Sequence, residues 1–180
     1  SRGRGFSLEV RQAFILTALS WLMIAAFAAL PFAFSELDLS YTDAFFESMS
    51  GVTTTGSTVI VGLDAAPPGI LIWRAILQWL GGIGIIVMAL SVLPLLRVGG
   101  MQLFRMESSD TSEKVLPRAA EIASSIGLIY VALTVMCASA YAACDMPWFD
   151  AVAHGMTTIA TGGFSTSDLS IGRFSSASVD

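Results

Sequence analysis

The sequence predicts an all-α membrane protein in which spanning helices alternate with two short re-entrant half-helices. Hydrophobic residues make up 54% of the chain and charged residues only 13%, which is about half the charged fraction of a typical soluble domain. Three windows contain no charged residue at all, namely 12–35, 75–96 and 122–144. Each window is long enough for a helix to cross about 30 Å of hydrocarbon.

Residues 1–97 are predicted to form one unit, made of two spanning helices with a shorter helix between them. The shorter helix, 41–52, is too short to cross a bilayer, and Thr42 or Asp43 can cap its N-terminus. An irregular polar segment over 53–66 follows it. The two spanning helices are predicted over 11–34 and 69–96.

Residues 119–180 are predicted to form a second unit, joined to the first by a linker over 98–118. A spanning helix over 119–143 precedes a half-helix over 148–159 and a Thr/Gly-rich segment over 160–166. The second unit therefore repeats the order of span, half-helix and loop, without the closing span.

The two half-helices and their loops carry the same residues at a fixed offset of 107 positions. The matched pairs are Asp43 and Asp150, Ala44 and Ala151, Met49 and Met156, Thr54 and Thr161, and Gly56 and Gly163. Irregular backbone at membrane depth is tolerated only where it is buried in protein or lines a watery cavity. Repeats in membrane transporters usually enclose a shared pathway, so the paired loops are predicted to line one.

Basic residues are distributed unequally along the chain. They precede the first span and occupy the linker, whereas 35–68 contains five acidic residues and no base. Because basic segments stay in the cytoplasm, the N-terminus and 97–118 are expected to be cytoplasmic, with both Thr/Gly loops facing outward. The net charge of −5 favours cations and offers no basic surface for nucleic acid.

The Thr/Gly segments have the chemistry needed to hold a dehydrated monovalent cation. Stacked backbone carbonyls can replace the water around such an ion without trapping it. Glycine reaches the unusual backbone angles that this stacking requires, which makes Gly56 and Gly163 the best candidates. Each half-helix would also direct the partial negative charge of its C-terminus toward the ion.

The segments Asp43–Thr58 and Asp150–Thr166 resemble the pore loops of the Trk/Ktr/HKT superfamily of potassium transporters, and most closely those of its bacterial TrkH-type membrane subunits. The stretch Trp73–Gly84 resembles the start of the second pore helix of that family. The resemblance implies four span–loop–span units around one pore, of which this chain holds about two. It also implies that a carbonyl filter is formed by Thr54, Thr55, Gly56, Thr161, Gly162 and Gly163.

The resemblance carries further expectations about activity and partners. It implies potassium uptake across a bacterial inner membrane, by a symporter or a channel-like route, with potassium as the substrate and no covalent cofactor. It also implies a cytoplasmic nucleotide-binding regulatory subunit and a homodimer. Two loops give half of a fourfold ring, so either the natural chain continues or two copies assemble, and the first is favoured.

Two other functions remain open at this stage. One is a sodium-permeable relative, although sodium-selective members often carry serine where Gly56 or Gly163 stands here. The other is a membrane scaffold or sensor that conducts no ion. An enzyme is not predicted, because serines such as Ser48 and Ser57 have no base nearby in the sequence.

Four polar residues inside the apolar segments have alternative interpretations. Arg74 is expected near the outer interface, where its side chain can snorkel. Gln78 either faces the vestibule of the pore or forms a hydrogen bond between helices. Glu47 either attracts cations at the mouth or satisfies backbone behind the filter. His154 is expected to pack or hydrogen-bond, because its surroundings offer too few metal ligands.

The stretch Gly81-Gly82-Ile83-Gly84 invites a dinucleotide-binding interpretation. It lacks the final glycine of that fingerprint and lies in the middle of a span, not after a strand. Small residues instead allow helices to approach closely, so close packing is predicted at these glycines.

Overall fold

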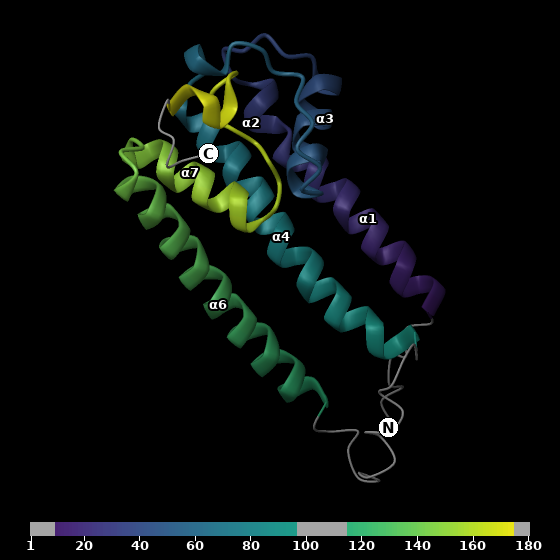
Figure 1. Cartoon of the computed structure of the whole chain (residues 1–180). Coiled ribbons are helices and arrows are strands. Elements are labelled where there is room, and N and C mark those ends of the chain that lie inside the picture. The colour runs from purple at the N-terminus through teal and green to yellow at the C-terminus, as the bar shows by residue number, and fades with distance from the viewer. Residues whose placement is uncertain (1–9, 97–114, 175–180) are drawn as a thin grey trace, which may run out of the picture.

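The computed structural model describes residues 10–96 and 115–174 (Figure 1). Within these ranges the protein is helical and contains no strand. The predicted linker over 98–118 lies almost entirely outside the described residues, as do the first nine residues with their basic side chains. The division into two units and a linker therefore stays a prediction.

Three helices are long and apolar enough to span a membrane, as the sequence predicts. They are α1 (Val10–Ala28) together with the short α2 (Leu30–Ala33), α4 (Pro68–Leu96) and α6 (Val115–Ala143). The spans within them cover Phe14–Ala33, Pro68–Met88 and Ala123–Ala143. The chain is therefore a multi-pass membrane protein with a helical fold, and this prediction is confirmed.

The first span is one helix in the prediction but two in the structure. The helix is interrupted at Ala29, and Pro31 occupies the first turn of α2. Proline has no backbone N–H and cannot continue the hydrogen-bond ladder of the preceding turn, which accounts for the interruption.

Both half-helices occupy the predicted residues, α3 at Tyr41–Val52 and α7 at Trp148–Ile159. The prediction of the cap was wrong. Ser40, with extended backbone angles, is the N-cap of α3, and its Oγ accepts a hydrogen bond from the backbone N–H of Asp43. An N-cap residue must lie outside the helical region, whereas Thr42 and Asp43 are already inside the helix.

Helix α4 occupies the centre of the molecule, with α1 and α3 on one side and α6 and α7 on the other (Figure 1). The C-terminal end of α3 packs directly against Gly81 of α4, where a Cβ would overlap the carbonyl of Val52. Ala160, at the end of α7, packs against Gly82. The close packing predicted at these glycines is confirmed, and it places both half-helix ends against one helix.

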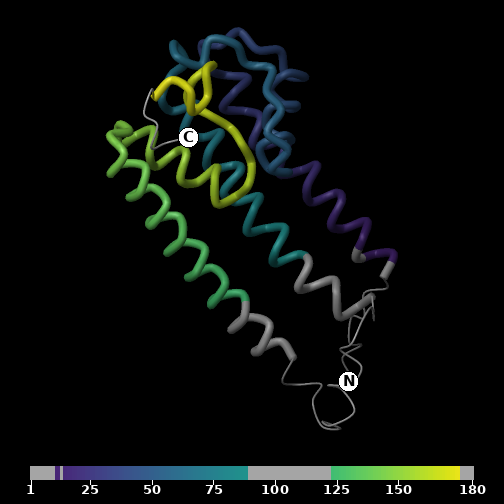
Figure 2. The backbone as a smooth tube through the Cα atoms, in the orientation of Figure 1, coloured from purple at the N-terminus to yellow at the C-terminus, as the bar shows by residue number. Residues whose placement is uncertain are grey.

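The outward faces of α1 and α6 carry large apolar side chains. Phe27 is 65% exposed and Leu128 is 72% exposed, as suits helices that face lipid or further transmembrane helices. A buried apolar cluster, which includes Phe32, Val52 and Leu77, fills the space between α1, α3 and α4. The chain segments after both half-helices lie together at the same end of the molecule (Figure 2).

Candidate functional site

Each half-helix ends in the same hydrogen-bonded turn. After α3, the N–H groups of Thr54 and Thr55 return to the carbonyls of Gly51 and Ser50. After α7, the N–H groups of Thr161 and Gly162 return to the carbonyls of Thr158 and Thr157. This is the pattern of a Schellman motif. We call the segments that leave these turns loop 1 (53–58) and loop 2 (160–165).

The two loops share an unusual backbone conformation. Thr54 and Thr161 have φ of 56° and 54°, and Gly56 and Gly163 both have φ of 80°. The residue between each pair, Thr55 or Gly162, is not in this left-handed region. A threonine in this region costs about 1–2 kcal/mol, and strain of this kind collects at functional sites. The two loops therefore repeat one backbone shape, strained threonine included.

Most backbone carbonyls of the predicted filter accept no hydrogen bond from the described residues. Within the described part of the chain, no hydrogen bond is accepted by the backbone oxygens of Thr54, Thr55, Gly56, Thr161 and Gly163. These are five of the six residues predicted to form a filter. The sixth, Gly162, accepts a hydrogen bond from Gln78 at 2.7 Å. The loops thus place free oxygens at the negative ends of two helix dipoles.

The two loops touch each other. A Cβ on Gly56 would overlap the carbonyl oxygen of Gly162, so only glycine fits at position 56. Gly56 and Gly163 both line one open pocket between the loops. Gly163 itself faces open space, because an added Cβ would meet no atom within 4 Å. The two matched glycines therefore converge and are not directed apart.

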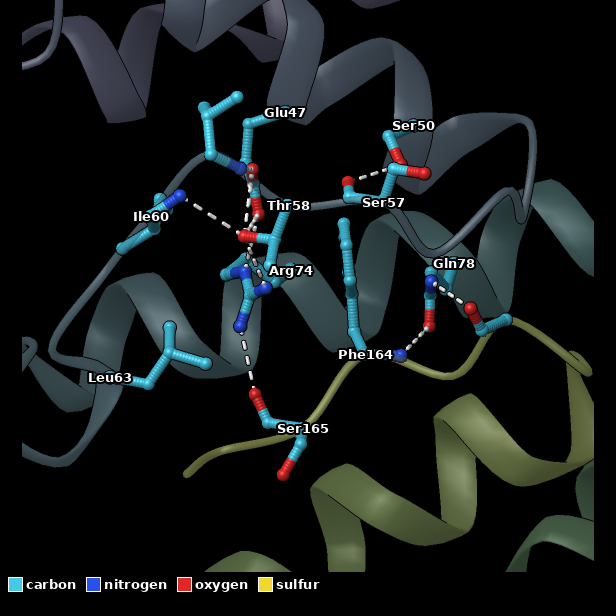
Figure 3. A network of polar contacts seen from close by, with 12 residues as sticks. Glu47, Ser50, Ser57, Thr58, Ile60, Leu63, Arg74, Gln78, Phe164 and Ser165 are labelled. Atoms are coloured by element: carbon cyan, nitrogen blue, oxygen red, sulfur yellow. Dashed lines mark hydrogen bonds and ion pairs between the residues drawn. The ribbon is translucent and has the colours of Figure 1, made fainter. Parts of the chain in front are cut away.

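Gln78 of α4 holds loop 2 from one side. Its fully buried carboxamide donates to the carbonyl of Gly162 and accepts from the N–H of Phe164 at 3.1 Å (Figure 3). The two bonds lie on either side of Gly163. Of the two alternatives for Gln78, the structure contains a hydrogen-bonding role, but its partners are the backbone of loop 2 and not another helix.

The side chain of Arg74 does not snorkel to the surface, and that expectation was wrong. Its side chain is 1% exposed and forms an ion pair with Glu47, with 2.7 Å between Nε and Oε1. Charged side chains inside a membrane protein pair with one another because an unpaired charge there is costly. Arg74 and Glu47 are the oppositely charged residues of two adjacent helices, and this was the signal that sequence reasoning missed.

Glu47 also holds loop 1. Its carboxylate accepts from the hydroxyl of Thr58 and from the N–H of Val59 at 3.0 Å. Of the two alternatives for Glu47, the structure contains the one in which it satisfies backbone behind the loop. The carboxylate is fully buried, so it presents no exposed charge to attract cations at a mouth.

Arg74 extends the same network to loop 2. Its Nη1 donates to the carbonyl of Ser165 at 2.8 Å, and its guanidinium lies 4.1 Å from the centre of the Phe164 ring (Figure 3). Phe164 is 3% exposed and stands between Arg74 and Gln78 in the close view. One side of α4 therefore contacts both loops.

His154 occupies the position in α7 that Glu47 occupies in α3. Its Nδ1 lies 2.8 Å from the carbonyl of Asp150, and its Nε2 lies 3.1 Å from the hydroxyl of Ser165. No group of three potential metal-ligating side chains occurs in the described residues. The hydrogen-bonding role expected for His154 is confirmed.

Asp168 is a further residue that the sequence did not single out. Its carboxylate accepts from the N–H groups of Gly62 and Leu63, both at 3.2 Å. Nearby, Arg173 forms an exposed ion pair with Asp64. These contacts join the segment after loop 2 to the segment after loop 1, where the sequence showed only a polar tail.

Comparison with known proteins identifies relatives over nearly the whole chain. A family model described as TrkH, cation transport protein, matches residues 2–179. The Trk system potassium uptake protein TrkH of Salmonella typhimurium is 52% identical over 96% of this chain and 36% of its own length. TrkI of Halomonas elongata is 51% identical over 93% of this chain and 34% of its own length.

A solved structure agrees with the fold. The crystal structure of the potassium transporter TrkH from Vibrio parahaemolyticus matches 99% of this chain with a TM-score of 0.84 and 44% identity. The match covers 36% of that protein, so this chain spans about a third of the length of its relatives. With its family model, its curated relatives and its fold in agreement, the chain belongs to the TrkH family of cation transport proteins.

Proposed function

We propose that the protein of which this chain forms about a third takes up potassium ions across a membrane. The ions pass in single file through a filter of backbone carbonyls. Thr54, Thr55, Gly56, Thr161, Gly162 and Gly163 supply this chain's part of that filter. Potassium is the substrate, no covalent cofactor takes part, and the chain is no enzyme.

One observation carries the proposal. Two loops, 107 residues apart, share one left-handed backbone pattern and leave five carbonyl oxygens without a hydrogen bond in the described residues. Carbonyl oxygens replace the hydration shell of potassium in other selective pores. The Gly162 oxygen is engaged by Gln78 but retains a second lone pair, so it contributes less than the others.

The relatives support the choice of ion. The similar proteins from Salmonella and Halomonas are named for potassium uptake. A sodium-permeable relative, which is the alternative within the same class, would require the loops to admit the smaller ion. A scaffold or sensor without conduction would leave without a role the five carbonyl oxygens of the two loops that are unpartnered in the described residues.

The test is an ion-flux measurement on the full-length protein in lipid vesicles. The expected result is an uptake of potassium or rubidium that exceeds that of sodium under equal gradients. Equal sodium uptake would favour the sodium-permeable alternative. If the reconstituted protein carried no monovalent cation, the proposal would be overturned in favour of a scaffold or sensor.

The proposed setting is a bacterial inner membrane, with the N-terminus and 97–118 cytoplasmic and both loops outside. The absence of Lys and Arg from 35–68 supports this orientation. Val61 is 90% exposed beside loop 1, so Val61→Cys offers a test once Cys137 and Cys144 are replaced by alanine. A maleimide that cannot cross membranes should label this cysteine from outside in intact cells. Labelling only after lysis would show that this segment faces the cytoplasm, which is the opposite orientation.

A cytoplasmic nucleotide-binding subunit, a homodimer and symport complete the proposal. Their support is the family resemblance of the loops and of α4. Purification of the full-length protein from its natural host tests the first two, through co-purification of a subunit that binds adenine nucleotides and through the mass of the complex. A potassium flux that is unaffected by the proton or sodium gradient would contradict symport.

A further inference from the structure

We propose that Gln78 of α4 is a positioning residue that fixes the direction of the Gly163 carbonyl, and so sets ion selectivity in loop 2. The inference rests on the proposed function, because it assigns the element that holds one filter carbonyl in place. Gln78 is not itself part of the carbonyl path.

The first step is the geometry of the peptide bonds. In a trans peptide the N–H of one residue and the C=O of the residue before it point in opposite directions, and no cis peptide occurs in the described residues. The N–H of Phe164 points at Gln78 Oε1, 3.1 Å away. The carbonyl of Gly163 must therefore point away from Gln78.

The second step is the environment of Gly163. The buried carboxamide of Gln78 bonds to both neighbours of Gly163, and Gly163 also lines a pocket that it shares with Gly56. No atom lies within 4 Å of the place where a Cβ on Gly163 would stand. Glycine with φ of 80° is free to rotate its peptide planes. The Gln78 contact is what removes that freedom.

The third step is that, in the described residues, no side chain from outside α7 and loop 2 other than Gln78 bonds to the backbone between Thr161 and Phe164. A Cβ on Gly162 would overlap the carboxamide, so the amide is packed directly against the loop. Gln78 belongs to the helix that follows loop 1, so one repeat orients the filter of the other.

The fourth step is the energetic cost of losing the two hydrogen bonds from Gln78 to loop 2. A buried donor or acceptor without a partner is unfavourable, so without Gln78 the Phe164 N–H and the Gly162 carbonyl would seek new partners. The available movement is a rotation of the peptide planes around Gly163. That rotation takes the Gly163 carbonyl out of line and admits ions that a fixed ring of carbonyls rejects.

The experiment compares potassium and sodium uptake by the full-length protein in vesicles. Gln78→Leu removes both hydrogen bonds at similar volume, and Gln78→Asn keeps the amide but is one methylene too short to bridge both partners. Each variant is expected to lower the potassium-to-sodium uptake ratio roughly tenfold, through increased sodium entry. The ratio is independent of how much protein folds.

Thr134→Val is the matched control. Thr134 of α6 is 8% exposed, and its hydroxyl accepts a hydrogen bond at 2.9 Å from Nε1 of Trp79, the residue that follows Gln78. In the described residues the Thr134 hydroxyl bonds to Trp79 and Tyr130 and to neither loop. It should retain the wild-type ratio. If the Gln78 variants also retain it, or lower only the amount of folded protein, the role is structural and the inference is overturned. A wild-type protein without potassium uptake would instead overturn the proposed function.

Discussion

Loops 1 and 2 share a backbone shape but are held in place by different means. The backbone of loop 1 is held by its own half-helix, since Ser50 donates to the carbonyl of Ser57 and Glu47 accepts from Thr58 and Val59. Arg74 of α4 adds a hydrogen bond to the Thr58 hydroxyl. The backbone of loop 2 is held by α4 of the preceding repeat, through Gln78 and Arg74, while His154 of its own half-helix bonds to the Ser165 hydroxyl. The backbone pattern is thus the invariant part, and the supporting contacts differ between the repeats.

The largest expected effect is the loss of Arg74. Arg74→Met would leave the Glu47 carboxylate buried and unpaired, which costs about 3–5 kcal/mol. His154→Leu, at the position in α7 matched to Glu47, breaks two hydrogen bonds worth about 1 kcal/mol each. The fraction of full-length protein that stays folded after heating in detergent measures both.

A partial recovery is expected when Glu47→Gln is added to Arg74→Met, because the buried charge is then removed. Recovery cannot be complete, since Arg74 also bonds to Ser165. Equal losses for Arg74→Met and His154→Leu would show that the ion pair is not the stronger support.

The second-largest expected effect is a loss of potassium selectivity that differs between variants of the two matched glycines. Gly56→Ala and Gly163→Ala each place a Cβ at φ of 80°, which costs about 1–2 kcal/mol. Only at Gly56 does the Cβ also overlap the carbonyl of Gly162. We expect both variants to lose potassium selectivity in flux assays, with the greater loss for Gly56→Ala. Unchanged selectivity in Gly56→Ala would contradict its assigned place, and a greater loss at Gly163 would reverse the comparison.

A smaller effect is expected at the matched hydroxyls Ser50 and Thr157. Ser50 donates to the carbonyl of Ser57 at 2.6 Å, whereas Thr157 bonds within its own helix to His154. Ser50→Ala should therefore cost about 1 kcal/mol and raise sodium uptake through loop 1. Thr157→Val should leave the uptake ratio unchanged, and a similar change in both variants would count against the self-supporting character of loop 1.

The smallest expected effect is at the exposed ion pair of Asp64 and Arg173. Their side chains are 46% and 47% exposed, and an exposed pair contributes about 0–1 kcal/mol. Asp64→Asn should change the thermal midpoint of the full-length protein little, and the difference should shrink further in high salt. A large destabilisation would mean that this contact, and not Asp168, joins the two loop segments.

The sequence was sufficient to predict where the helices lie and which two loops are candidates for the site. Charge-free windows predicted the spans, and the repeat placed α3 and α7 at the residues observed. The supporting contacts were less accessible. Arg74 was expected near the interface because a lone arginine near the end of a span usually snorkels. Its partner Glu47 is 27 residues away, and no local periodicity links the two.

The contacts between repeats were the least predictable. Gln78 and Phe164 are 86 residues apart, and Asp168 and Gly62 are 106 apart. A hydrogen bond at such a separation depends on how α7 packs against α4, which the residue pattern of either helix alone does not specify. The matched glycines were found because they repeat, whereas the position matched to Asp168 is Val61, so the repeat did not point to Asp168.

The contact from Arg74 to Ser165 spans 91 residues, and this separation bears on how the protein is made. At roughly 5–20 residues per second, the ribosome needs roughly 5 to 20 seconds to deliver Ser165 after Arg74 has been synthesised. Through that interval the guanidinium has no Ser165 carbonyl to bond to. The set of contacts around Arg74 is therefore complete only after the second repeat has been synthesised.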